Sequence, residues 1–167
     1  MKVDDGQAFF HCDYCGCYDF PDPNLDGVAL LDEVSTFACP ICHKPLVSAV
    51  VKDIPIDSCP SCRGNLISQS KMLPILRQVQ PLVSTGEELI YPQNKAELTR
   101  EILCPSCRKM MCVYPYGGPG NVIIQGCEKC RLIWLDFGEL SRIIQSFKQM
   151  YNQPSDELGA KRKSVEF

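Results

Sequence analysis

Eight of the twelve cysteines form two matched sets, and cysteine thiolates can act as metal ligands or as redox groups. Each set contains two pairs with Cys-x2-Cys spacing, separated by a stretch long enough for one β-hairpin. Four thiolates at this spacing suit a closed tetrahedral site for a structural zinc ion. The sequence therefore predicts two Zn²⁺ per chain. The predicted ligands are Cys39, Cys42, Cys59 and Cys62 in the first site, and Cys104, Cys107, Cys127 and Cys130 in the second.

A further pair, Cys12 and Cys15, has the same spacing but no obvious mate. Cys17, His11, His43 or the same pair of another chain could complete a third metal site around it. Pairing it instead with the first knuckle of the first set would break the repeat, so we disfavour that arrangement. Whether a third zinc is bound stays open at this point.

The elements that hold these cysteines are also repeated. Residues 46–51 and 54–56 in the first unit, and 112–116 and 122–125 in the second, have the pattern of short hairpin strands. Two strands of this length are not stable alone, and a structural zinc contributes on the order of 10–16 kcal/mol. We expect a small, metal-stabilised α+β fold: two tandem zinc ribbons, each a short β-hairpin followed by a helix. Cys112, in a strand, is expected to be a small buried residue.

The helix of the second unit has complete local signals. Asp136 is the expected N-cap, and Glu139 three residues later completes a capping box. In the first unit Ser70 is the expected cap, because Pro74 is tolerated only near a helix start. An apolar stripe in the second helix is expected to pack on its own domain, with a partner groove as the alternative. The stripe consists of Leu140, Ile143, Ile144, Phe147 and Met150.

These signals divide the chain into five parts. Residues 1–36 are an N-terminal lead-in with the incomplete knuckle, 37–80 are ribbon 1, 81–103 a linker, 104–151 ribbon 2, and 152–167 a flexible tail.

Composition and charge restrict the class of protein. No apolar run is long enough for a membrane span, and the N-terminus lacks the apolar core of a signal peptide. We therefore expect a cytoplasmic protein whose thiols stay reduced, which favours metal ligation over disulfides. The first 60 residues carry 9 Asp and 1 Glu against 3 Lys. Two filled sites would shift the formal charge from −3 to about −7, which disfavours binding to a polyanion.

The second unit resembles the bacterial zinc-finger family named after transcription factor IIB. The resemblance rests on Cys104-Pro-Ser-Cys107, Cys127-Glu-Lys-Cys130 and Trp134-Leu-Asp-Phe-Gly-Glu-Leu140, with Met111 in place of a leucine. The first unit matches through its cysteines, but the Trp, Asp, Gly and Glu that should follow Cys62 are absent. The resemblance implies zinc-ribbon folds and zinc ligation at the eight matching cysteines. The family name suggests transcription, which is an analogy of fold.

Three functions are compatible with these patterns. The favoured one is a non-enzymatic module that binds a protein partner, because a site closed by four cysteines has no open position for catalysis. The alternative is direct binding of nucleic acid, and thiol redox or zinc handling is a less favoured one. Nucleic-acid binding would use Arg108, Lys109, Lys129 and Arg131, with Tyr114, Tyr116 or Trp134 stacking on bases.

Overall fold

A computed structural model describes residues 22–78, 95–116 and 122–152, together with 2–3, 10–11 and 18–19 near the N-terminus. Residues 79–94, which include the first part of the predicted linker, the hairpin tip at 117–121 and the predicted tail beyond Asn152 lie outside the described residues. The N-terminal strands β1 (Lys2–Val3), β2 (Phe10–His11) and β3 (Tyr18–Asp19) form a separate three-stranded sheet. No helix among the described residues is both long and apolar enough to cross a membrane.

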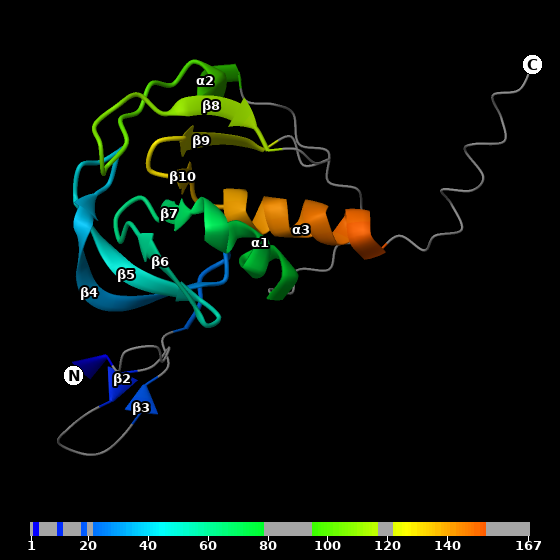
Figure 1. Cartoon of the computed structure of the whole chain (residues 1–167). Helices are drawn as coiled ribbons and strands as arrows, with labels where there is room; N and C mark the ends of the chain where they lie inside the picture. The colour runs from blue at the N-terminus through cyan, green and yellow to red at the C-terminus, as the bar shows by residue number, and fades with distance from the viewer. Residues whose placement is uncertain are drawn as a thin grey trace, which may run out of the picture.

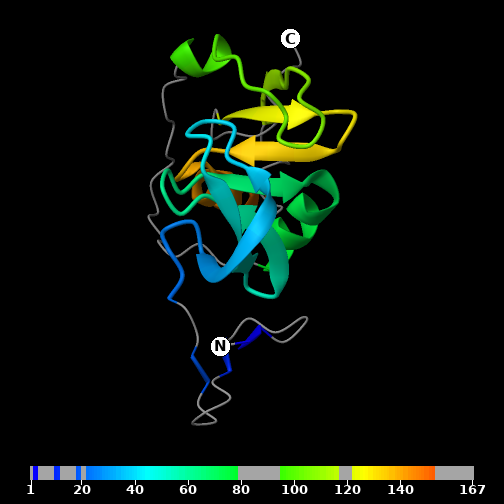
Figure 2. The same ribbon diagram turned by 90° about the vertical axis from the view of Figure 1, so that its left-hand side faces the viewer.

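A seven-stranded antiparallel sheet forms the body of the protein (Figure 1). Ribbon 1 supplies one half and ribbon 2 the other, so that β9 and β10 lie above the strands of ribbon 1 in Figure 2. The spatial order is β4 (Val28–Ala38), β5 (Pro45–Val51), β6 (Ile54–Ser58), β7 (Asn65–Ser68), β10 (Leu132–Leu135), β9 (Ile123–Cys127) and β8 (Cys112–Pro115). Both predicted hairpins are present. The third strand of each ribbon, β7 or β10, was not predicted, and β4 crosses the predicted boundary at residue 37.

The two ribbons join where β7 pairs with β10. Leu66 lies opposite Trp134, and the pairs on either side are Ile67 with Ile133 and Asn65 with Leu135. In the repeat, Leu66 and Trp134 are equivalent residues, 68 positions apart. The pairing therefore maps onto itself when the two units are exchanged, as in an isologous dimer interface. The chain is an intramolecular pair of ribbons with a local two-fold axis through Leu66 and Trp134.

Two helices cover one face of this sheet, α1 (Gln69–Gln78) and α3 (Glu139–Asn152), and they contact each other (Figure 1). The stripe of α3 packs inward: Leu140, Ile143 and Ile144 are buried in the same core as Ile67 and Ile133. The prediction that this stripe packs within the protein is confirmed for these three residues, although the core that they join contains residues of both ribbons and not of ribbon 2 alone. The alternative of a partner groove is wrong for these three residues.

The start of α1 differs from the prediction. It begins at Gln69, directly after Ser68, whereas the sequence favoured a later start capped by Ser70. The helix therefore contains Pro74, which removes one backbone donor from its interior. Burial of Met72, Ile75 and Leu76 against the sheet holds the helix despite this loss. The short helix α2 (Lys95–Leu98) lies within the segment 81–103 that was predicted to be a linker.

The opposite face of the sheet carries both cysteine clusters. Leu66, Trp134, Leu46 and Met111 are buried there beside the cysteines in one continuous core. This arrangement follows from strand alternation, because Leu66 and Trp134 point away from the helix face that Ile67 and Ile133 occupy. The two cysteine clusters therefore share a hydrophobic core.

Cys112 differs from the sequence-based expectation. It is exposed, not buried, because β8 is the last strand of the sheet in the described part of the chain. Its equivalent in ribbon 1, Val47, lies within the sheet because β4 covers β5.

The N-terminus of α3 is capped by a residue far away in sequence. Asp26, which is buried, accepts backbone N–H bonds from Gly138 at 2.8 Å and from Ser141 at 3.0 Å. Glu139 accepts the backbone N–H of Asp136 at 2.7 Å, which is the predicted half of the capping box. The expected N-cap role of the Asp136 side chain is wrong. Its carboxylate instead accepts the Trp134 indole N–H at 3.0 Å and pairs with Arg100 at 2.6 Å.

Candidate metal centres

Four turns with one common geometry, the knuckles, hold the cysteines. In three of them the first cysteine's carbonyl accepts the N–H four residues later, from His43, Arg63 or Arg108, at 2.8–3.0 Å. These residues and Arg131, at the same place in the fourth knuckle, all have positive φ angles between 53° and 61°. A non-glycine residue in this conformation costs about 1–3 kcal/mol, so the surrounding structure must hold each turn. The turns bring the sulfur of the second cysteine back toward the first.

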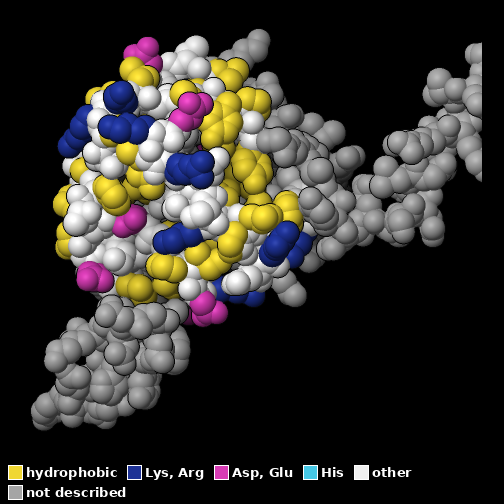
Figure 3. Space-filling view, in the orientation of Figure 1, with side chains coloured by type: hydrophobic (Ala, Val, Ile, Leu, Met, Phe, Trp, Pro, Cys, Tyr) yellow, Lys and Arg dark blue, Asp and Glu magenta, His cyan; other side chains and the backbone are white. Residues whose placement is uncertain are grey.

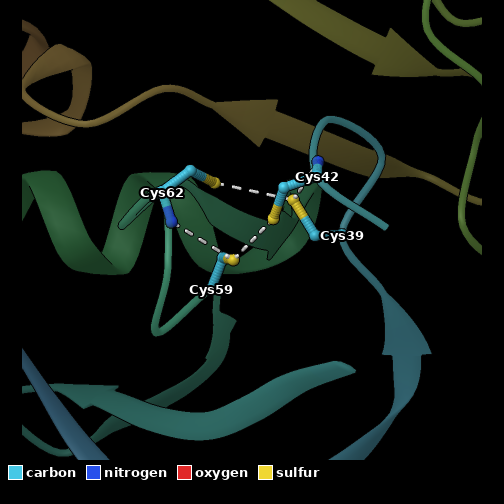
Figure 4. Close-up of side chains that lie close together, drawn as sticks. All are labelled: Cys39, Cys42, Cys59 and Cys62. Carbon is cyan, nitrogen blue, oxygen red and sulfur yellow. Dashed lines mark hydrogen bonds between the residues drawn. The ribbon is translucent and has the colours of Figure 1, made fainter. Parts of the chain in front are cut away.

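The first centre gathers Cys39, Cys42, Cys59 and Cys62 at the β4–β5 and β6–β7 turns (Figure 4). The Sγ atoms of Cys39 and Cys62 are 3.5 Å apart, and those of Cys42 and Cys59 are 3.4 Å apart. A tetrahedral ion with metal–sulfur bonds of about 2.3 Å would separate its sulfurs by roughly 3.8 Å. These two sulfur–sulfur distances are therefore within a few tenths of an ångström of those in a tetrahedral site.

The second centre gathers Cys104, Cys107, Cys127 and Cys130 in the same arrangement. The Sγ atoms of Cys107 and Cys127 are 3.6 Å apart, and in both centres all four sulfurs lie within 4.8 Å of one another. In each centre, the first cysteine of each knuckle is buried and the second is partly exposed. Each group can hold one metal ion.

Backbone N–H groups supply part of the positive charge that the thiolates need. Amides of Ile41 and Cys42 point to the Cys39 sulfur at 3.4 Å. The backbone N–H of Lys44 lowers the pKa of Cys42 to about 7, and that of Lys109 does the same for Cys107. Burial raises the pKa of Cys39, and it raises the pKa of Cys104 to about 12. Cys39 and Cys104 are therefore protonated at neutral pH without a bound cation, so metal binding must release their protons.

The motif that follows the fourth knuckle packs next to the second metal centre. Trp134 is fully buried, and its ring lies against Gly64 of ribbon 1, where an added Cβ would come within 2.3 Å of the indole. Arg100 bridges Asp136 and Gln125, the latter at 3.1 Å. The buried side chain of Trp134 therefore connects the second centre with the ribbon junction. Sequence analysis missed the supporting roles of Gly64, Arg100 and Asp26, because no local pattern marks a contact between distant segments.

The residues considered for stacking on bases lie in different environments. Trp134 is buried, and Tyr116 packs against the core under the helices, whereas Tyr114 is 37% exposed. Arg63 lies over the Phe137 ring at 3.8 Å, across the ribbon junction. Only Tyr114 of the three proposed aromatic residues is placed to meet a ligand.

The possible third site at Cys12 and Cys15 lies outside the described residues, as does Cys17. His43 is exposed at a knuckle turn and belongs to neither of the two cysteine groups.

Comparison with known families agrees with the repeat. The family described as transcription factor zinc-finger matches twice, over residues 38–77 and 103–146. These ranges enclose both cysteine centres and both helix starts. Searches of curated proteins and of solved structures gave no match. With two tandem matches that together span half of its length, the chain belongs to the transcription factor zinc-finger family.

Proposed function

We propose that the protein is a zinc-binding, non-enzymatic interaction module that docks a protein partner, as an adaptor in a transcription-related process in the cytoplasm. Zinc is the ion that fits four converging thiolates best, and it needs no redox chemistry to do so. Coordination by four sulfurs leaves no open position for substrate or water, so the metal's role is structural.

One observation carries the proposal of a protein partner. An apolar strip is exposed on ribbon 2, in the segment that runs from α2 through the first knuckle to β8. Its members are Leu98 (44% exposed), Leu103 (47%), Met110 (52%) and Tyr114 (37%). Leu103 and Met110 are directly opposite each other in a β-bridge. Exposed apolar residues grouped in this way mark interaction surfaces more often than isolated ones do.

The equivalent positions of ribbon 1, all of them described, form no such strip. The residues equivalent to Leu103, Met110 and Tyr114 are Ala38, Pro45 and Ala49, and Ala49 is fully buried. The strip is thus a property of ribbon 2 and not a consequence of the shared fold.

Nucleic-acid binding is the second candidate, favoured by basic residues in the knuckles. Figure 3 shows Lys and Arg side chains gathered over the segment between α2 and β8. The knuckles hold six basic residues and one acidic residue, Glu128, but two zinc–tetrathiolate groups add a charge of about −4. The net field around the centres is therefore weak. This balance, with Trp134 buried and Arg63 held on Phe137, makes nucleic acid the less favoured partner.

The test is affinity capture from native lysate, with and without nuclease. Met110→Lys should abolish capture of the protein partner, whereas Leu73→Lys should not, because Leu73 is similarly exposed (45%) but lies on α1 away from the strip. Both variants should keep the wild-type zinc content. Capture that depends on nucleic acid, or that both variants retain, would refute the proposal.

A further inference from the structure

Each metal centre lies next to the strand pair that joins the two ribbons. Strand β7 begins at Asn65, three residues after Cys62, and β10 begins at Leu132, two residues after Cys130. These two strands pair with each other at the ribbon junction. The second knuckle of each ribbon therefore leads directly into the junction.

Each second knuckle also contacts the other ribbon. Arg63, at the positive-φ position of the second knuckle of ribbon 1, lies over the ring of Phe137 of ribbon 2 at 3.8 Å. Arg131, at the same position in ribbon 2, accepts the backbone N–H of Gln69 of ribbon 1 at 2.8 Å. Arg63 and Arg131 are 68 positions apart, and so are Gln69 and Phe137. The two contacts are therefore equivalent under the local two-fold arrangement.

These contacts connect metal binding in one ribbon with folding of the other. Strands β7 and β10 have four residues each, and strands this short are stable only within a larger sheet. An ion holds the second knuckle of its own ribbon in place, and with it the contact to the other ribbon. The first ion to bind must therefore order the junction, whereas the second ion binds next to a junction that is already ordered.

We propose that the two centres bind zinc with positive cooperativity through the contacts of Arg63 and Arg131 with the opposite ribbon, so that the protein switches between a zinc-free and a two-zinc state. The proposal rests on the zinc-binding part of the proposed function and not on the partner. Leu103 and Met110 of the apolar strip flank the first knuckle of the second centre. Docking through the strip should therefore depend on free zinc more steeply than one independent site allows.

The proposal can be tested by native mass spectrometry of the full-length protein, with a zinc-buffering chelator and a phosphine reductant. Cys12→Ser and Cys15→Ser in every sample restrict the count to the two described centres. The measured quantity is the coupling ratio, which is the squared fraction of the one-zinc form divided by the product of the zinc-free and two-zinc fractions. Independent sites give a ratio of about 4 or more whether or not their affinities are equal, and coupling of about tenfold lowers it to about 0.4 for equal sites. We expect a ratio below about 1.

Two variants remove the contacts one at a time. Phe137→Ala removes the ring under Arg63 and should raise the coupling ratio about two- to fivefold. Gln69→Pro removes the N–H that binds the Arg131 carbonyl and should raise the ratio by a similar factor. Gln69 is the first residue of α1, where a helix tolerates proline. Both variants should still bind two zinc ions at saturation, which reports that they are folded.

Lys44→Ala is the matched control. Lys44 binds Ser61 at 3.0 Å and so links the two knuckles of the first centre within ribbon 1. Because this change affects one centre and no contact between ribbons, it should alter the coupling ratio by less than about twofold.

Three outcomes would overturn the proposal: a coupling ratio of about 4 or more, an equal rise in Lys44→Ala and Phe137→Ala, or a low ratio that neither Phe137→Ala nor Gln69→Pro changes. Failure of the proposed function gives a different result. Independent binding of two zinc ions would refute the cooperativity and leave the proposed function intact, whereas a protein that binds no zinc at saturation would refute the proposed function itself.

Discussion

The two ribbons share a backbone plan but differ where they meet. Ribbon 2 places Trp134 on the local two-fold axis, and ribbon 1 places Leu66 opposite it. Two indoles facing each other across one strand pair would need more room than the junction has, because Trp134 already fills the space over Gly64. A symmetric pairing of backbones thus requires unequal side chains on its axis. The absence of the Trp, Asp and Glu of the motif from ribbon 1 is consistent with a junction that has room for one indole. It does not by itself indicate a lost metal centre, because ribbon 1 has all four cysteines in one group.

The outer edges of the two ribbons differ as well. In ribbon 1, β4 pairs with β5 over its whole length. In the described part of ribbon 2, the segment that corresponds to β4 pairs only at the bridge between Leu103 and Met110, and α2 precedes it in the chain. Pro115 occupies the place of Val50, a residue that faces β4 in ribbon 1. Because proline has no N–H, it withholds a donor from any strand added there. The open edge of ribbon 2 is therefore protected against strand addition, and its exposed side chains are the available surface.

The largest predicted effect comes from removing a ligand. Cys127→Ser should lose one zinc and unfold both ribbons in a single transition, because the centres share one core and one sheet. Cys112→Ser should leave zinc content and melting unchanged, since Cys112 is exposed and in neither centre. Metal analysis and thermal melts followed by circular dichroism measure both. Equal zinc loss in the two variants would contradict the ligand assignment, and two separate transitions in Cys127→Ser would contradict the coupling of the ribbons.

The contact on the two-fold axis gives the next effect. Gly64→Ala should destabilise the zinc-loaded protein by about 1–3 kcal/mol, because its Cβ would overlap the indole of Trp134. Trp134→Leu also destabilises by removing buried surface, but in that background Gly64→Ala should cost little. A double-mutant cycle by urea unfolding measures this coupling. Additive effects would show that the two residues do not compete for one space.

The comparison also shows what the sequence could and could not predict. The cysteine centres, the hairpins and the inward stripe of α3 were predictable because each depends on spacing within one short segment. The joining of β7 to β10 was not, because Asn65–Ser68 has too few residues to show alternation. The exposure of Cys112 depends on the position of β8 as the last strand among the described residues, which no pattern within β8 reveals. The prediction that Asp136 is the N-cap is wrong for a different reason. Its carboxylate binds the indole N–H of Trp134 and the guanidinium of Arg100 in place of the backbone N–H groups of the helix.

The long-range cap of α3 gives a smaller effect. Asp26→Ala should destabilise the protein by about 0.5–2 kcal/mol, because it leaves the N–H groups of Gly138 and Ser141 without their acceptor. Hydrogen exchange should accelerate at Ser141 and through the first turn of α3, and α1 should change less. Asp22→Ala is the matched control, since Asp22 is exposed. Unchanged exchange at Ser141 in Asp26→Ala would show that the cap contributes nothing.

The last effect is a pH dependence of stability that originates in ribbon 2. Burial raises the pKa of Glu139 from 4.5 to about 8, and Lys71 takes its place in ribbon 1. Between these values the folded protein holds a proton that the unfolded chain releases, so stability must fall as pH rises. The slope due to Glu139 is at most about 1.4 kcal/mol per pH unit and ends near pH 8. Urea unfolding at saturating zinc, at pH 6, 7 and 8, should show a slope that Glu139→Gln reduces and Glu101→Gln, at an exposed site, leaves intact. Thiol titration affects all three proteins alike, so equal slopes in wild type and Glu139→Gln would mean that Glu139 is ionised in the folded state.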